Sequence, residues 1–212
     1  MTTAYEKKLR SDPDLVIREA SLYFNQQGDL YRTSQDLTRR LDEAGIPHAL
    51  IDGLALAQHG FVRMTEDIDI LLTPEGLSNF KDQMLGRGYV LAFSGARKTF
   101  RATDTGVRIE VITSGEYPGD GLPKAISFPN PATVAEERGG YRVISLDKLI
   151  ELKLASGMTA SHRRRDLADV QDLIRVLALS LDFAEKLDPS VQSLYTQLWQ
   201  EAQETDNLAE TE

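Results

Sequence analysis

The six residues DIDILL, from Asp67 to Leu72, place two carboxylates in an otherwise apolar run. A short apolar run of this kind is typical of a buried strand, and side chains two apart on a strand point to the same face. Asp67 and Asp69 therefore share one face. At about 4 Å and an effective dielectric constant of about 20, their repulsion is about 4 kcal/mol. That face must open to water or hold a cation.

A third carboxylate lies in the run VRIEVIT, from Val107 to Thr113. Its period-two alternation predicts a strand with Glu110 on the face opposite the valines. If this strand lies beside Asp67 and Asp69, three carboxylates meet, and carboxylate oxygens are the ligands that Mg²⁺ prefers. We therefore predict Asp67, Asp69 and Glu110 as ligands of Mg²⁺, with Mn²⁺ as a substitute. The alternative for Glu110 is a solvated residue on an edge strand.

Upstream of these carboxylates, Gly53 separates the short apolar run HALI from a predicted helical segment. A glycine between a strand and a helix lets backbone N–H groups approach a phosphate, and the start of a helix adds a partial positive charge. Gly53 is therefore a candidate phosphate contact.

Two later helices carry charged residues on their apolar faces. In SLDKLIELKLAS, Lys153 continues the stripe of Leu146, Leu149 and Ile150. It needs an acceptor, because a lone buried ammonium is costly, unless it reaches solvent at the edge of the stripe. In the next helix, the 100° spacing places Arg163 and Asp166 on the apolar face and Asp169 at its border. Arg163 and Asp166 face a core or a cleft, or they form a local ion pair at the helix start.

Helical and strand patterns are mixed along the chain, which predicts an α+β fold with a small mixed central sheet flanked by helices, and with further N-terminal and C-terminal helices. We expect a helical segment over 1–45, a core over 46–144, a helical region over 145–204 and a flexible acidic tail over 205–212. The expected helices cover Asp14–Gln27, Leu30–Ala44, Leu54–His59, Thr73–Leu85, Leu146–Ser156, His162–Leu177 and Pro189–Gln203. The expected strands are His48–Ile51, Asp67–Leu72, Tyr89–Phe93, Lys98–Ala102, Val107–Ile112, Tyr141–Ile144 and a short one near Phe128 in a loop over Thr113–Ala132.

Composition excludes several classes of function. The 212 residues include no cysteine, which removes disulfides, thiolate zinc sites and cysteine nucleophiles. A net charge of −9 argues against a broad nucleic-acid surface, and we expect no binding to DNA. No run is apolar and long enough to span a membrane, and the N-terminus lacks the apolar core of a secretory signal. We therefore expect a cytoplasmic protein.

The stretch GLALAQHGFVRMTEDIDILL resembles the nucleotidyltransferases of the DNA polymerase β superfamily, and is most similar to the AbiEii-type minimal bacterial proteins. The residues that carry this resemblance are Gly53, Ala55, His59, Gly60, Arg63, Thr65, Asp67, Ile68 and Asp69. The late helices match the same pattern at Lys153, Arg163, Arg165, Asp166 and Asp169. The resemblance covers about Ala49 to Leu177 and implies the nucleotidyltransferase fold.

The resemblance also implies roles for these residues. Asp67, Asp69, Glu110, Lys153 and Asp166 would be catalytic. The nucleotide would be bound by Gly53, Arg63, Thr65, Lys153 and Arg163. In such a site Lys153 and Arg163 neutralise phosphate charge, and Asp166 orients one of them or helps to activate the acceptor. Arg63 can also be a structural partner of a carboxylate, and His59 fits a helix end better than a ligand.

The activity implied is Mg²⁺-dependent transfer of a nucleoside monophosphate from a nucleoside triphosphate to a hydroxyl. The toxin-like resemblance implies a tRNA 3′ end or a protein hydroxyl as acceptor and an antitoxin or regulatory partner; a small-molecule acceptor is the lesser alternative. One position departs from the pattern: Asp52 stands where the family has its first glycine. Its carboxylate repels a triphosphate unless it turns away or joins the metal shell. A degenerate binding or regulatory protein and a metal-dependent phosphohydrolase are therefore the alternatives.

Overall fold

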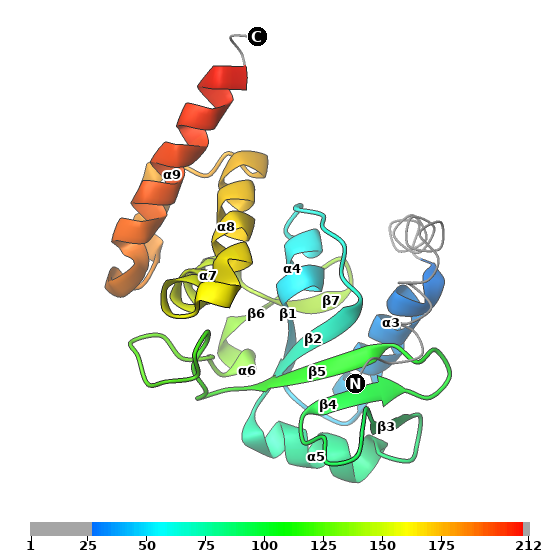
Figure 1. Cartoon of the computed structure of the whole chain (residues 1–212). Helices are drawn as coiled ribbons and strands as arrows, with labels where there is room; N and C mark the ends of the chain where they lie inside the picture. Colours follow the sequence, from blue (N-terminus) through cyan, green and yellow to red (C-terminus); the bar gives the residue numbers. More distant parts are fainter. Residues whose placement is uncertain (1–26, 210–212) are drawn as a thin grey trace.

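The protein is an α+β structure in which helices flank one mixed seven-stranded sheet (Figure 1). The computed structural model describes residues 27–209, apart from the side chains of residue 162 and of residues 205–209. The strand order is β3-β4-β5-β2-β1-β7-β6. The strands are β1 (His48–Ile51), β2 (Asp67–Leu72), β3 (Tyr89–Leu91), β4 (Thr99–Ala102), β5 (Arg108–Thr113), β6 (Ala135–Arg138) and β7 (Tyr141–Ile144).

Most of the helices overlap the expected ones, and the last helix continues to Ala209, beyond the expected end at Gln203. The helices are α3 (Gly28–Glu43), α4 (Asp52–Gln58), α5 (Pro74–Met84), α6 (Pro131–Val134), α7 (Leu146–Thr159), α8 (Arg164–Val176) and α9 (Pro189–Ala209), with short 3₁₀ turns at η1 (Ser161–Arg163) and η2 (Leu181–Lys186). In Figure 1, α7, α8 and α9 form a group at one end of the sheet, and α3 lies at the opposite side. The expected helix over Asp14–Gln27 falls on residues outside the described part, apart from Gln27.

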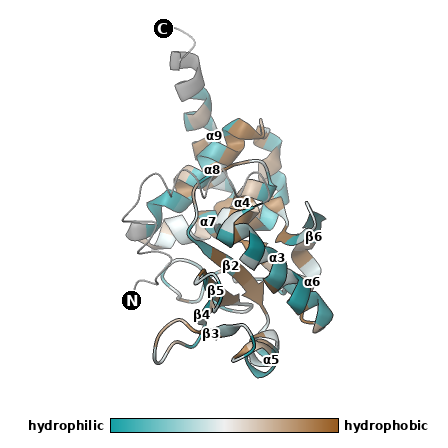
Figure 2. Ribbon diagram, turned by 90° about the vertical axis from the view of Figure 1, so that its right-hand side faces the viewer, coloured by the Kyte–Doolittle hydropathy of each residue, from teal (hydrophilic) through white to brown (hydrophobic). Residues whose placement is uncertain are grey.

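The central strands form the core. All four residues of β1 are buried, and β2 buries Ile68 and its last three residues while its aspartates stay partly exposed. β5 alternates between buried and partly exposed positions, as its sequence predicts. In Figure 2 the residues of β2, in the middle of the view, have the hydrophobic colour, whereas most residues of α3 have the hydrophilic colour. Leu37 and Leu41, four residues apart on one face of α3, are fully buried in the core.

The strands that pair with β2 determine where Asp67 and Asp69 lie in the sheet. β2 runs antiparallel to β1 and parallel to β5, so it lies at the centre of the sheet with a neighbour on each side. At the end of β2, the Thr73 side chain accepts a hydrogen bond from the Gly76 N–H at 2.9 Å, and Pro74 occupies the first turn of α5. This is the helix start that the Thr-Pro-Glu sequence predicts.

Two expectations for the segment after β5 are wrong. No strand forms near Phe128, although its backbone N–H donates to the Glu116 carbonyl and its carbonyl accepts from the Gly115 N–H, both at 2.8 Å. Pro129 has no N–H with which to continue this pairing. Beyond it, α6 and β6 were not expected. The strand β6 lies at the sheet edge with an exposed face, so its sequence lacks the alternation that indicates a half-buried strand.

Candidate active site

Three carboxylates converge where β2 and β5 pair. The parallel register places Asp69 opposite Glu110 and Asp67 opposite Arg108. One carboxylate oxygen from each of Asp67, Asp69 and Glu110 lies within 4.8 Å of the others. The register therefore brings together the three residues that the sequence predicts as metal ligands, on the partly exposed face of both strands.

The neighbours of these carboxylates hold two of them in place. The Thr65 hydroxyl lies 3.2 Å from both the carbonyl and the carboxylate of Asp67, so it orients that side chain. The Arg108 guanidinium forms an ion pair with Glu110. Thr65 thus contacts a candidate metal ligand in the protein itself, whereas the sequence analysis assigned it to the nucleotide.

This arrangement of carboxylates changes the pKa of Asp69. Burial is the largest cause that raises the pKa of Asp69 well above its ordinary value of 3.8, and the charges of Asp67, Asp52 and Glu110 raise it further. The ionised form is therefore unfavourable while the cluster lacks a compensating charge. A divalent cation supplies such a charge, and a set of three carboxylates is a donor set that suits Mg²⁺ or Mn²⁺.

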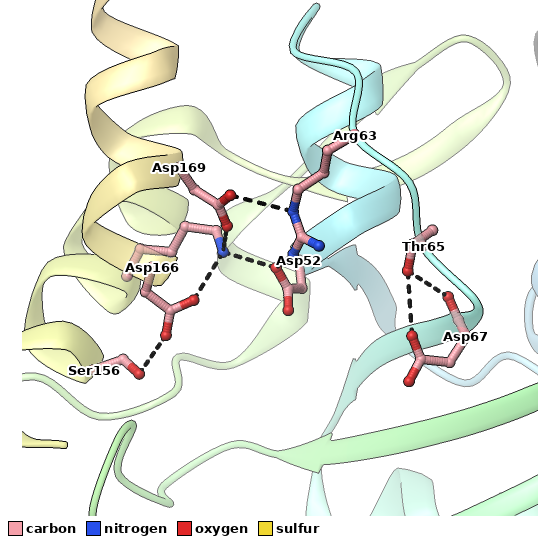
Figure 3. A network of polar contacts seen from close by, with 8 residues as sticks. Asp52, Arg63, Thr65, Asp67, Ser156, Asp166 and Asp169 are labelled. Atoms are coloured by element: carbon pink, nitrogen blue, oxygen red, sulfur yellow. Dashed lines mark hydrogen bonds and ion pairs between the residues drawn. The ribbon is translucent and has the colours of Figure 1, made fainter. Parts of the chain in front are cut away.

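A second cluster lies beside the first and is centred on Lys153 of α7. Its ammonium nitrogen is 2.7 Å from Asp52, 3.1 Å from Asp166 and 2.7 Å from Asp169. The second oxygen of Asp166 accepts a hydrogen bond of 2.6 Å from the Ser156 hydroxyl. Figure 3 shows this network between α8 and the start of α4. The acceptor that Lys153 needs is thus supplied by carboxylates of the protein.

Arg63 ties the two sides of the second cluster together. Its guanidinium lies 2.6 Å from Asp52 and 3.3 Å from Asp169. It is a partner of carboxylates, which is one of the two roles considered from the sequence. Although burial alone would raise it, the pKa of Asp52 is held below its ordinary value by the Lys153 ammonium and then by Arg63. Burial likewise disfavours the charged amine, yet the three aspartates together raise the pKa of Lys153.

Gly53 occupies a position that only glycine fits. A Cβ atom at Gly53 would lie 2.7 Å from the Cβ and 2.8 Å from the hydroxyl of Thr65. Gly53 therefore lets Thr65 approach the start of α4, and through Thr65 it supports Asp67. The contact with Thr65 by itself explains why this position is glycine, and the phosphate contact predicted from the sequence is not needed for that explanation.

Both clusters line one cavity of about 250 Å³. Its walls include Asp67, Asp69 and Glu110 on one side and Asp52, Lys153 and Asp166 on the other. The loop after β5 adds Pro118, Gly119 and Phe128. A Cβ at Gly119 would lie 2.3 Å from the Thr159 hydroxyl, so this loop packs directly on the end of α7.

Arg163 lines the same cavity from η1 rather than from α8. The helix expected to start at His162 starts at Arg164, with Arg163 as its N-cap, and Arg163 and Asp166 both line the cavity as the helical spacing predicted. Within the described part of the chain, Arg163 is exposed and has no ion pair. Of the three cations among the described residues that line the cavity, Arg63 and Lys153 contact carboxylates, whereas the exposed Arg163 can meet an anion.

The structure therefore gathers every predicted site residue around one cavity, with Gly53 behind Thr65. Sequence reasoning missed Ser156 and the loop residues Pro118 and Gly119, and it placed Asp169 at the border of a face where it is in fact buried. The three-residue spacing of Lys153 and Ser156 on one helix face was a usable signal for Ser156. His59 ends α4, is buried and lies 2.8 Å from the Ile144 carbonyl through Nε2, as expected for a helix-end residue.

No protein-family model and no curated protein matches this chain. Solved structures of low sequence identity do resemble it. JHP933 from Helicobacter pylori is 15% identical, with 84% of this chain and 96% of that chain covered and a TM-score of 0.41. ANT(2'')-Ia, solved in complex with adenylyl-2''-tobramycin, is 16% identical, with coverage of 74% and 90% and a TM-score of 0.46.

A nucleotidyltransferase-like protein from Paracoccidioides brasiliensis is 14% identical, with coverage of 68% and 74% and a TM-score of 0.44. At these identities and TM-scores we assign no function from the likeness, and the side-chain geometry must carry any assignment.

Among the described residues, none of the helices is sufficiently long and apolar to cross a lipid bilayer.

Proposed function

We propose that this chain is a Mg²⁺-dependent nucleotidyltransferase, which moves a nucleoside monophosphate from a nucleoside triphosphate to an acceptor hydroxyl. The observation that carries the proposal is the convergence of Asp67, Asp69 and Glu110 at a cavity, through the register of two parallel strands. Without a cation this arrangement is unfavourable, as the raised pKa of Asp69 indicates.

These three carboxylates would hold Mg²⁺, with Mn²⁺ as a substitute. When bound, such ions offset the charge that develops on the attacking and leaving oxygens of a phosphoryl displacement. The remaining chemistry falls to side chains of this chain. Thr65 orients Asp67, and the exposed guanidinium of Arg163 is available to a phosphate of the nucleotide.

Proton transfer from the acceptor hydroxyl requires a carboxylate within hydrogen-bond reach of that hydroxyl. Both oxygens of Asp166 accept hydrogen bonds, one from Lys153 and one from Ser156. Asp166 therefore serves to hold Lys153 in place. Glu110, which is paired with Arg108, lines the cavity with a side chain that is 37% exposed, against 11% for Asp166, and this greater access makes it the better candidate for the proton acceptor.

For the acceptor we propose a macromolecular hydroxyl, either a tRNA 3′ end or a protein side chain. This finer proposal is supported by the resemblance of the motif to AbiEii-type toxins, and by the three consecutive arginines at positions 163–165, all exposed and beginning at the cavity. A toxin-like activity of this kind would imply an antitoxin or other regulatory partner in the cytoplasm.

A second candidate is a catalytically degenerate binding protein. The observation that favours it is the engagement of Lys153 and Arg63 by aspartates of the protein, which leaves fewer cations for a triphosphate. It predicts that no nucleoside triphosphate produces heat in calorimetry with Mg²⁺.

The test of transfer uses labelled nucleoside triphosphates, Mg²⁺ and a cell extract, with Asp69→Asn compared with the unchanged protein. We expect a labelled macromolecule, and a loss of labelling of about a thousandfold in the variant, equivalent to about 4 kcal/mol. The matched control is Asp182→Asn, which removes the same charge from the exposed 3₁₀ turn η2. Transfer that persists in Asp69→Asn would contradict the proposed site.

A further inference from the structure

Asp52 has a backbone conformation that favours glycine. Its φ angle is +53°, in the left-handed region, and Ala178 is the other non-glycine residue with a positive φ in the described chain. Aspartate tolerates this region better than most residues, but glycine enters it without a steric cost. Local backbone geometry therefore does not explain why this position carries an aspartate side chain.

The contacts of Asp52 supply one. A single oxygen, Oδ1, lies 2.7 Å from the Lys153 ammonium and 2.6 Å from the Arg63 guanidinium. These cations come from two separate elements, α7 and the segment between α4 and β2. One carboxylate oxygen thus occupies the point at which both cations meet, which is the arrangement a phosphate oxygen makes with lysine and arginine.

Charge in this cluster exceeds what the two cations require. Asp52, Asp166 and Asp169 supply three negative charges against the two positive charges of Lys153 and Arg63. Asp166 and Asp169 are buried and already contact Lys153, so they alone balance the cations. Without Asp52 the cluster would be neutral and both cations would keep donors directed toward the cavity.

Asp52 is more exposed at this cluster than either of its two cations. Its side chain is 32% exposed, against 17% for Arg63 and 5% for Lys153, and all three residues line the cavity. Of these three side chains, the Asp52 carboxylate is therefore the most accessible to an anion in the cavity.

We propose that Asp52 is an internal counter-anion, which occupies the phosphate position at Lys153 and Arg63 and lowers the affinity of the cavity for polyphosphate ligands. This inference rests on the proposed function for the identity of the ligand, a nucleoside triphosphate. A polyphosphate must displace the Asp52 carboxylate from both cations or bind beside it against its charge. Asp52 therefore sets the affinity for the triphosphate without taking part in the chemistry.

The test measures binding of inorganic tripolyphosphate in the presence of Mg²⁺, by calorimetry, to the full chain and to Asp52→Asn and Asp52→Gly. Asparagine and glycine both adopt a positive φ, so both variants keep the backbone of α4. Circular dichroism and thermal melting confirm that each variant is folded. Asp182→Asn is the matched control, because it removes one negative charge from an exposed site on η2.

We expect Kd for tripolyphosphate to fall at least tenfold in both Asp52 variants and to change less than twofold in Asp182→Asn. An unchanged or higher Kd in folded Asp52→Asn and Asp52→Gly would overturn the inference, because Asp52 would then support binding or have no influence on it. Equal tightening in Asp182→Asn would also overturn it, since the effect would then follow net charge alone.

Failure of the proposed function gives a different pattern. If the Asp52 variants bind tripolyphosphate more tightly but no variant transfers a labelled nucleotide, the counter-anion role stands and the transferase assignment fails. If the unchanged protein transfers nucleotide and Kd does not respond to Asp52, only the counter-anion role fails.

Discussion

The replacement Lys153→Met tests the buried ionic cluster most directly. Methionine keeps the length of the side chain and removes the ammonium, which is 5% exposed and lies 2.7, 3.1 and 2.7 Å from three carboxylate oxygens. At an effective dielectric constant of about 20, each contact corresponds to about 5–6 kcal/mol of Coulomb energy. Most of this is offset by the cost of desolvating the charges.

The net effect follows from what remains after the replacement. Asp166 and Asp169 stay buried without the ammonium, and removal of one partner from a buried ion pair costs about 3–5 kcal/mol. For a chain of 212 residues, each kcal/mol lowers Tm by about 2–4 °C, so we expect a decrease of about 6–20 °C. Urea unfolding followed by circular dichroism measures the free energy of unfolding.

The pH dependence gives a second, independent result. In the unchanged protein, Lys153 holds the pKa of Asp52 below its ordinary value, so this stabilisation is present above pH 3.8 and is lost as the pH falls through the lower value in the folded state. In Lys153→Met that cation is missing, so this stabilisation through Asp52 is missing as well. The difference in stability between the two proteins should therefore shrink as the pH falls below about 3.8.

Lys186→Met is the matched control, since this exposed lysine lies over the Phe183 ring, at 5.3 Å, and its replacement should cost less than about 1 kcal/mol. A loss below about 1 kcal/mol for Lys153→Met, or a loss that grows as the pH falls, would refute the account of the cluster.

Three further predictions concern separate parts of the molecule. Gly53→Ala should destabilise the protein by about 1–3 kcal/mol in urea unfolding, because the new Cβ meets Thr65. Adding Thr65→Gly to the same chain should recover part of this loss of stability, and no recovery would contradict the contact. Burial lowers the pKa of His48 and His59 below 6.5, so the unfolded chain binds more protons than the folded chain and the free energy of unfolding should fall as the pH drops below about 6.5. This decrease should be less steep in His48→Gln, and an equal slope would show that His48 does not contribute to the pH dependence. Arg163→Ala should leave unfolding within about 0.5 kcal/mol and weaken nucleotide binding in calorimetry, and unchanged binding would remove Arg163 from the site.

Local patterns in the sequence determined the strands and helices that carry the site. Alternation and apolar runs identified β2 and β5, and the Thr-Pro-Glu sequence marked the start of α5. Those signals act within a few residues, because strand and helix periodicity repeats at short range. They also identified the shared face of Asp67 and Asp69. The edge strand β6 escaped detection, since an exposed strand has no apolar alternation to reveal it.

Only the tertiary structure decided which charges meet. The sequence showed that Lys153 needs an acceptor, but only the fold brings Asp52, which lies 101 residues earlier at the start of α4, to Lys153 as one of its three acceptors. The meeting of Glu110 with Asp69 likewise depended on the register of β2 and β5. Ion pairing acts over a few ångströms in space, whereas sequence periodicity reports neighbours along one element. For that reason the residue types of the site were visible in the sequence, and their partners were not.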